Sequence, residues 1–202
     1  MATTHQSAVV LVPPPEIWAP IQAIRRIHDR QFRRWMPHVT LLYPFLPRGA
    51  LAQAVPTAAE ALAVLRRFEI VLARLDAFRH RGGTFTMWLA PEPKGALVAL
   101  QAALVRRFPE CDSVNRFGGG FTPHLSVGQA RGEDEVRALR SELAGWKPLA
   151  FTARSVTIIV RDPPPNRFTA SHSGKRRTSA SCSATSASFG SGASHSVNVP
   201  PR

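Results

Sequence analysis

Apolar residues recur along the chain at two periods, every second residue in some segments and every third or fourth in others. The first period is typical of strands and the second of helices packed on a core. We therefore expect helices at residues 17–27, 56–67, 93–108 and 133–144, and strands at residues 7–12, 38–45, 68–78, 85–90, 121–128 and 150–161. In chain order the elements read strand, helix, strand, helix, strand, and then the series repeats. This order predicts an internal duplication within an α+β fold.

The second strand of each predicted half carries the same short motif. One copy reads His38-Val39-Thr40-Leu41 and the other His124-Leu125-Ser126-Val127, and a proline precedes each. Because residues i and i+2 of a strand point to the same face, His38 shares a face with Thr40, and His124 with Ser126. The apolar residues between them point to the other face and would anchor the strand. Two such strands beside one groove would form a site with two imidazoles and two hydroxyls.

Composition and charge indicate the size of the core and the kind of partner. The chain has 202 residues, of which 44% are hydrophobic, which favours a single domain followed by a tail. Its net charge of +13 favours a polyanionic partner such as nucleic acid, because lysine and arginine neutralise phosphates. The alternative is that the charge serves only solubility.

The composition changes at the run of prolines at residues 163–165. Residues 171–202 are rich in serine, contain no acidic residue and have few large apolar side chains. Such a segment does not bury enough surface to offset its ordering entropy. We therefore predict one domain over residues 1–165 and a disordered basic tail over residues 166–202.

Cysteine content and the N-terminal segment indicate the compartment. The two cysteines, Cys111 and Cys182, form neither a disulfide framework nor a C-x-x-C pair, which is typical of a reducing compartment. Residues 1–7 place no positive charge ahead of a long apolar run, and no run elsewhere approaches membrane-spanning length, so we expect neither a secretion signal nor a membrane span. We expect a monomer in the cytoplasm, or in the nucleus if the organism is eukaryotic, with no membrane partner.

Several other kinds of site are excluded because their sequence motifs are absent. The triplet Gly118-Gly119-Gly120 lacks the Gly-Lys-Ser/Thr that completes a phosphate-binding loop. Neither H-E-x-x-H nor G-x-S-x-G occurs, and the remaining histidines lack metal-ligand spacing with cysteines or acids. We therefore expect no metal and no cofactor.

The paired motifs resemble the signature of the 2H phosphoesterase superfamily. Pro37 before the first motif and Phe121-Thr122-Pro123 before the second strengthen the resemblance. Members include the RNA 2′,3′-cyclic phosphodiesterases, also called 2′-5′ RNA ligases, and the resemblance covers about residues 7–161. It implies a two-lobed, duplicated fold in which each lobe is an antiparallel sheet with helices on its outer face, and in which the active-site groove lies between the lobes. Members usually continue with one or two ordered strands where this chain has its serine-rich segment.

Two histidines suit the chemistry that this resemblance implies. Opening a cyclic phosphate needs a base to take a proton from water and an acid to protonate the leaving ribose oxygen, and a pKa of about 6.5 suits histidine to both roles. The resemblance makes His38 the proton donor and His124 the acceptor. Thr40 and Ser126 would donate hydrogen bonds to the phosphate oxygens, where charge builds in the transition state. With an RNA 5′-hydroxyl in place of water, the reverse reaction makes a 2′-5′ linkage.

Four further residues are candidate RNA contacts. Tyr43 and Phe45 follow the first motif and would stack on bases, although core packing is an equal alternative. Arg33 and Arg34 precede the motif and suit phosphates, although a solvated face is the alternative for both.

Three functions remain open on the sequence alone. The first is a metal-independent phosphodiesterase that opens 2′,3′-cyclic phosphate ends of RNA or small nucleotides. The second is a phosphodiesterase for another cyclic or 2′-5′ linked substrate, and the third is a non-catalytic RNA- or nucleotide-binding module on the same fold. The intact histidines and hydroxyls favour an enzyme, because a binding module has no need of a matched acid and base.

Overall fold

A computed structural model describes residues 2–63, 65–115, 120–161 and 182–188. Its main elements confirm the predicted α+β class and the predicted order. In these residues the helices are α1 (Trp18–His28), α2 (Leu51–Ala63), α3 (Lys94–Arg107) and α4 (Gly132–Glu142). The strands are β1 (Ser7–Leu11), β2 (Val39–Leu42), β3 (Phe68–Arg79), β4 (Thr84–Glu92), β5 (Leu125–Arg131), β6 (Leu149–Ala153), β7 (Ser155–Arg161) and β8 (Cys182–Ser188).

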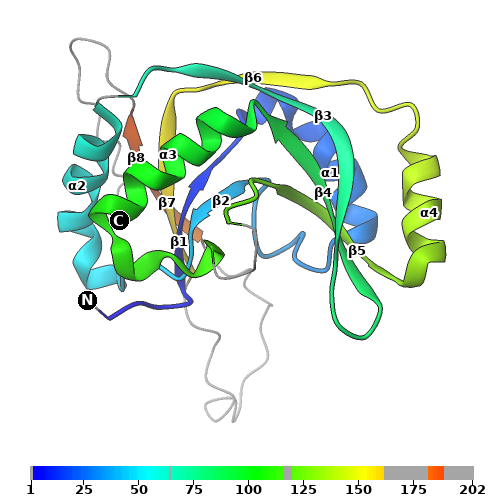
Figure 1. Ribbon diagram of the computed structural model, residues 1–202, viewed down its shortest axis with the longest axis horizontal. Helices are drawn as coiled ribbons and strands as arrows, with labels where there is room; N and C mark the ends of the chain where they lie inside the picture. The colour runs from blue at the N-terminus through cyan, green and yellow to red at the C-terminus, as the bar shows by residue number, and fades with distance from the viewer. Residues whose placement is uncertain (1, 64, 116–119, 162–181, 189–202) are drawn as a thin grey trace, which may run out of the picture.

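All eight strands form one curled sheet in the order β6-β3-β4-β5-β2-β1-β7-β8 (Figure 1). Every neighbouring pair is antiparallel. At the centre of the sheet β2 meets β5, where Val39 pairs with Leu125. This junction divides the sheet into two lobes of four strands, which confirms the predicted two-lobed architecture.

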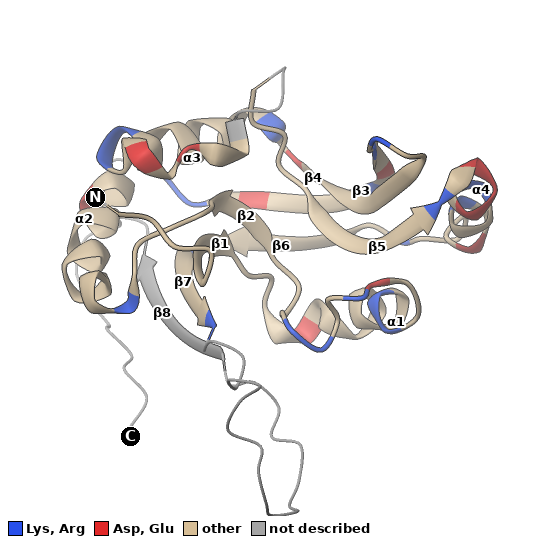
Figure 2. Ribbon diagram, turned by 90° about the horizontal axis from the view of Figure 1, so that it is seen from below, with Lys and Arg blue, Asp and Glu red and all other residues tan. Residues whose placement is uncertain are grey.

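The two lobes are not the two halves of the sequence. Strand β3 belongs to the first half but pairs with β4 of the second, and β7 of the second half pairs with β1 of the first. The helices cross in the same way, since α1 packs against β5 and α3 against β2. Figures 1 and 2 show α2 and α3 at one end of the sheet and α1 and α4 at the other. The turn between β3 and β4 contains Gly82 and Gly83, whose φ angles of 79° and 71° favour glycine.

The last predicted strand, at residues 150–161, is two strands that lie far apart in the sheet. Strand β6 pairs with β3, whereas β7 pairs with β1 and β8. The alternation of buried residues changes phase between them, from Phe151 and Ala153 to Val156 and Ile158. A single continuous strand keeps one phase, so the shift marks the break at Arg154, which the apolar count alone did not reveal.

The second helix begins earlier than predicted. The sequence pattern placed Pro56 in its first turn, but α2 begins at Leu51 and contains Pro56 in its interior. A 3₁₀ turn at Arg48–Ala50, which follows Pro47, leads into the helix. Proline in a helix interior removes one hydrogen bond, and the burial of residues such as Leu62 against the core offsets this loss.

The predicted tail contains one strand. We expected disorder over this segment, but residues 182–188 form β8, which pairs with β7 from Ser155↔Ser188 to Arg161↔Cys182. The sheet is therefore extended at the edge where the family resemblance implies further strands. The rest of the tail, and Gly118 and Gly119 of the predicted glycine turn, lie outside the described residues.

The main core lies between the sheet and its helices and takes up the apolar positions of both motifs. Val39, Leu41, Leu125 and Val127 are fully buried in it. This confirms the alternation predicted from the sequence, and each such side chain contributes roughly 1.5–3 kcal/mol by burial. The polar residues of the motifs consequently point to the opposite face of the central strands.

Candidate active site

His38 and His124 each stand one residue before a central strand of the sheet. The antiparallel pair Val39↔Leu125 fixes the register between them. Continued by one residue in each direction, this register sets position 38 opposite 126 and position 40 opposite 124. The structure thus brings the four motif residues into the wall of one cavity of about 230 Å³, lined among others by His38, Thr40, His124 and Ser126.

Backbone carbonyls orient both imidazoles in the same way. Nδ1 of His38 lies 2.7 Å from the carbonyl oxygen of Met36, and Nδ1 of His124 lies 2.9 Å from that of Thr122. Because a carbonyl oxygen only accepts hydrogen bonds, Nδ1 carries the proton in both rings. The lone pair of each neutral ring is then on Nε2. Nε2 is therefore the atom of each ring that can take up a proton and release it again.

Aromatic rings lie beside both imidazoles. The centroid of the Trp35 ring is 6.2 Å from that of His38, and the Phe78 and Trp88 rings are 4.9 and 6.0 Å from that of His124. Burial makes a charge costly here. It lowers the pKa of His38 to about 4 and also lowers the pKa of His124, although the carbonyl hydrogen bonds act in the opposite direction. Both imidazoles are consequently neutral in the free protein at neutral pH.

Charged neighbours act on His38 as well. The Arg25 guanidinium and a protonated His124 both lower the pKa of His38, and the Asp29 carboxylate raises it. A proton on one imidazole therefore disfavours a proton on the other. The site favours states with at most one imidazolium, and one imidazolium beside one neutral imidazole is the combination that acid–base catalysis uses.

A β-bulge in β5 changes which residues face the cavity. Ser126 and Gly128 pair with successive residues of β4, which leaves Val127 as an extra residue in the strand. Strict alternation would turn Gln129 away from Ser126, but a bulge reverses the phase of the residues that follow it. Gln129 and its cross-strand partner Thr86 consequently line the cavity.

Several residues of the cavity wall were not predicted from the sequence. They are Arg25, Asp29, Gln31, Trp35, Met36, Thr86 and Gln129. Arg25 and Asp29 stand four residues apart, as partners on one helix face do, but nothing in the sequence marks this pair as buried. The position of Gln129 on the cavity face could not be predicted, because the bulge breaks the two-residue period on which the prediction relied.

The four candidate RNA contacts lie in different environments. Phe45 is fully buried and packs against Phe108 at a centroid distance of 5.1 Å, so the structure places it in the core. Tyr43 is 37% exposed. Arg33 and Arg34 are exposed on the segment between α1 and β2, and they do not line the cavity. RNA contact by Tyr43 and the two arginines remains a prediction.

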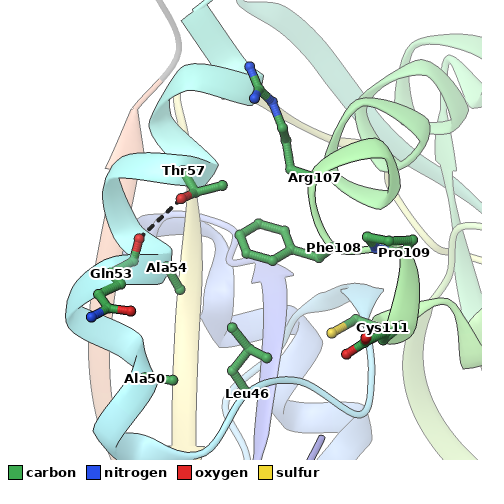
Figure 3. A pocket seen from close by; sticks show the side chains of 10 residues that line it. Leu46, Ala50, Gln53, Ala54, Thr57, Arg107, Phe108, Pro109 and Cys111 are labelled. Carbon is green, nitrogen blue, oxygen red and sulfur yellow. Dashed lines mark hydrogen bonds between the residues drawn. The ribbon is translucent and has the colours of Figure 1, made fainter. Parts of the chain in front are cut away.

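A second cavity, of about 300 Å³, lies between α2 and the end of α3 (Figure 3). Leu46, Phe108 and Cys111 contribute to its lining, and the Thr57 hydroxyl donates to the Gln53 carbonyl at 3.1 Å. Burial raises the pKa of the Cys111 thiol, which disfavours the reactive thiolate. No histidine is among the lining residues, so this cavity lacks the paired imidazoles of the first.

The part of the chain that the structure describes contains neither a metal-binding cluster nor a membrane-spanning helix. Among the described residues, no three or more His, Cys, Asp and Glu side chains are grouped so as to hold a metal ion. The helices in these residues are also too short or too polar to cross a membrane.

The fold and the site together define a class of protein. A curled antiparallel sheet with a histidine at the start of each of two equivalent central strands is the arrangement of a 2H phosphoesterase. A family model described as the 2′-5′ RNA ligase superfamily matches residues 13–164, and the chain belongs to this superfamily. No curated protein matches the chain.

Solved structures share the fold at low sequence identity. E. coli LigT in complex with NADP⁺ is 16% identical, with a TM-score of 0.54 over 94% of this chain and 100% of that one. LigT in complex with 3′-AMP is 14% identical, with a TM-score of 0.53 over 92% and 98%. The protein TT0787 of Thermus thermophilus is 16% identical, with a TM-score of 0.58 over 91% and 97%.

Proposed function

We propose that this protein opens 2′,3′-cyclic phosphate ends of RNA or small nucleotides by acid–base catalysis with His38 and His124, without a metal. The observation that carries the proposal is the matched orientation of the two imidazoles. Each is held through Nδ1 by the carbonyl two residues before it, in the wall of one cavity. This leaves Nε2 of each ring for proton transfer, one to accept and one to donate.

The reaction needs one bond made and one broken at phosphorus. One imidazole takes a proton from water, whose oxygen bonds to phosphorus, while the other gives a proton to the leaving 3′ oxygen, and a 2′-phosphate results. Thr40 and Ser126 donate to the non-bridging oxygens. In the roles that the family resemblance implies, His38 is the acid. Its pKa of about 4 in the free protein must then rise when the anionic phosphate binds, and a nearby negative charge has this effect.

The size of the cavity supports recognition of an end group. Its volume of about 230 Å³ is below the roughly 300–1,000 Å³ of pockets that enclose a drug-sized ligand. It suits a cyclic phosphate with part of its ribose, while the base and the rest of an RNA lie outside. Complexes of LigT with NADP⁺, 3′-AMP and ATP support nucleotide binding on this fold. Reverse 2′-5′ ligation would use the same groups with a 5′-hydroxyl as nucleophile.

The decisive experiment follows ring opening of an oligonucleotide that ends in a 2′,3′-cyclic phosphate, in the presence of a chelator. We expect the wild type to form a 2′-phosphate, and we expect His38→Ala and His124→Ala each to lower kcat by about 10²–10⁴-fold. His28→Gln is the matched control, because His28 pairs with Glu142 at 3.0 Å and does not line the cavity.

Two outcomes would count against the proposal. Tight RNA binding without ring opening would favour the non-catalytic binding module. Activity that the chelator abolishes would exclude the metal-independent mechanism. If neither binding nor opening is seen, 2′-5′ linked oligonucleotides and other cyclic phosphates are the next substrates to test.

A further inference from the structure

We propose that Arg25, Asp29 and Gln129 form a positioning network that holds the two catalytic histidines in place relative to each other. The inference rests on the proposed function and adds residues that act through His38 and His124 rather than on the substrate. The network runs from the end of α1, through the segment before β2, to β5.

Arg25 is committed to protein partners. Its side chain is buried, with 2% of the residue exposed. Nε donates to Oδ2 of Asp29 at 2.8 Å, Nη1 to Oε1 of Gln22 at 3.0 Å, and Nη2 to the carbonyl of Trp35 at 2.9 Å. Three of the five guanidinium N–H donors thus bind protein groups, and together with the burial of the side chain this favours a role in holding the chain over a role as a phosphate ligand.

The bond to Trp35 acts directly beside His38. The carbonyl that Arg25 holds belongs to Trp35, and the next carbonyl along the chain, that of Met36, accepts the hydrogen bond from Nδ1 of His38. Fixing the first carbonyl restricts the second, since a single residue joins the two peptide planes. Arg25 therefore restricts the orientation of the His38 ring through the backbone.

Asp29 and Gln129 extend the network to the strand of the second histidine. Oδ1 of Asp29 accepts from Nε2 of Gln129 at 3.1 Å, and Oε1 of Gln129 accepts from the backbone N–H of Arg30 at 3.0 Å. Both ends of the Gln129 amide thus bind the segment after α1. Gln129 stands three residues after Ser126 in β5, so this amide connects the His124 strand to the segment that leads to His38.

The two central strands need such a link because their own pairing is short. Between β2 and β5, as far as the described residues show, the register consists of the single pair Val39↔Leu125. A short ladder leaves the ends of the strands free to splay, whereas a satisfied buried polar network fixes one arrangement. The cavity lies beside this junction, so a change in the angle between the strands would separate the two imidazoles.

Gln129→Ala is the sharpest test, because it cuts the link to β5 and leaves the Arg25–Asp29 pair intact. We expect kcat on the cyclic-phosphate oligonucleotide to fall about 10-fold or more, because small displacements of catalytic groups cost up to about 10²-fold. We expect KM to change less than about twofold, since the phosphate donors remain. Gln53→Ala is the matched control, at an exposed glutamine on α2 beside the second cavity, and should leave kcat unchanged. An unchanged kcat in Gln129→Ala would overturn the inference.

A second variant separates positioning from folding. Arg25→Gln leaves the Asp29 charge buried and unpaired, and such a variant can fail to fold. The double variant Arg25→Met/Asp29→Leu removes both charges together, which proteins tolerate better. We expect it to keep its melting temperature within a few degrees of wild type and to lose kcat as Gln129→Ala does. A folded double variant with wild-type kcat would contradict the proposal.

A spectroscopic readout keeps this inference distinct from the proposed function. The imidazole ¹⁵N signals of His38 and His124 report ring orientation and tautomer without any substrate. We expect Gln129→Ala to shift one or both of them and Gln53→Ala to shift neither. If the wild type opens no cyclic phosphate, the proposed function fails, yet shifted signals would still support the network. Unchanged signals would refute it.

Discussion

Leu41 and Val127 occupy equivalent places in the two central strands, each as the extra residue of a β-bulge three positions after a cavity histidine. Both side chains are fully buried. A bulge reverses the phase of the residues that follow it, which in β5 brings Gln129 to the cavity face after Ser126. The duplication therefore extends beyond the four-residue motifs that the sequence displays.

The two hydroxyls are expected to act in the transition state. Thr40→Val and Ser126→Ala should each lower kcat by about 10²-fold, because each removes a donor to the developing charge on phosphate. Thr57→Val provides the control, since its hydroxyl bonds the Gln53 carbonyl beside the second cavity. Steady-state kinetics on the cyclic-phosphate oligonucleotide measures the effect. A loss confined to KM would assign these hydroxyls to ground-state binding instead.

The pH dependence of activity should differ between the free and the bound enzyme. Burial lowers the pKa of His38 to about 4 and also lowers that of His124. The imidazole that serves as the acid therefore loses its proton at a lower pH than an ordinary histidine does. We expect kcat/KM, which reports the free enzyme, to be greatest below about pH 6.5 and to fall as pH rises. The kcat profile should lie at higher pH, because bound phosphate stabilises an imidazolium. Coinciding profiles would show that phosphate has no such effect.

Stability should also depend on the protonation of His38. Its pKa is about 4 in the folded chain, below the ordinary histidine value of 6.5, so the unfolded state binds more protons between these pH values. The stabilisation from His38 is complete above about pH 6.5 and is lost as pH falls toward 4, with a total on the order of 3 kcal/mol. Urea unfolding of wild type and His38→Gln at pH 7 and pH 4.5 measures it. Equal pH dependence in the two proteins would contradict the lowered pKa.

Gly128 is required for the packing of α1 on β5. A Cβ at this position would lie 2.6 Å from Cβ of His28, and Gly128→Ala should destabilise the fold by roughly 1–3 kcal/mol. Gly95, in the first turn of α3, has no atom within 4 Å of an added Cβ, and Gly95→Ala should stabilise the fold by up to about 1 kcal/mol. Thermal unfolding of both variants provides the comparison, and effects of the same sign would disprove the predicted contrast.

Truncation of Phe45 should mainly reduce stability, whereas truncation of Tyr43 should mainly reduce RNA affinity. Phe45 is fully buried, so Phe45→Ala should cost about 3–5 kcal/mol of stability. Tyr43 is 37% exposed and its ring contacts that of His5, so Tyr43→Ala should cost less stability than Phe45→Ala, while it weakens RNA binding by about 1–3 kcal/mol if the ring stacks on a base. Chemical unfolding and RNA titration of both variants distinguish the two roles. Unaltered RNA affinity in Tyr43→Ala would remove this residue from the proposed site.

The sequence predicted those parts of the site that a two-residue period encodes. His38, Thr40, His124 and Ser126 stand in regular alternation with buried residues, so their common face was readable without coordinates. The order of the elements was readable for the same reason. Both depend on local patterns that the surrounding structure does not override.

The sequence did not reveal features that depend on long-range pairing. The bulge that brings Gln129 to the cavity exists only in the register between β4 and β5. Arg25 and Asp29 have the spacing of an ordinary ion pair on a helix, and the sequence does not show that the pair is buried or that Arg25 binds the segment before β2. The break at Arg154 separates two strands whose partners lie in different lobes.

The exchange of β3 and β7 between the lobes has a consequence for the duplicated halves. A chain cut at the β3–β4 turn would yield two fragments, and neither would contain all the strands of one lobe. Strand β3 lies between β4 and β6, and β7 lies between β1 and β8. The halves are interlocked, so each supplies an interior strand to the sheet of the other. Neither repeat is therefore an autonomous folding unit, and the two histidines come together only when both repeats have folded around each other.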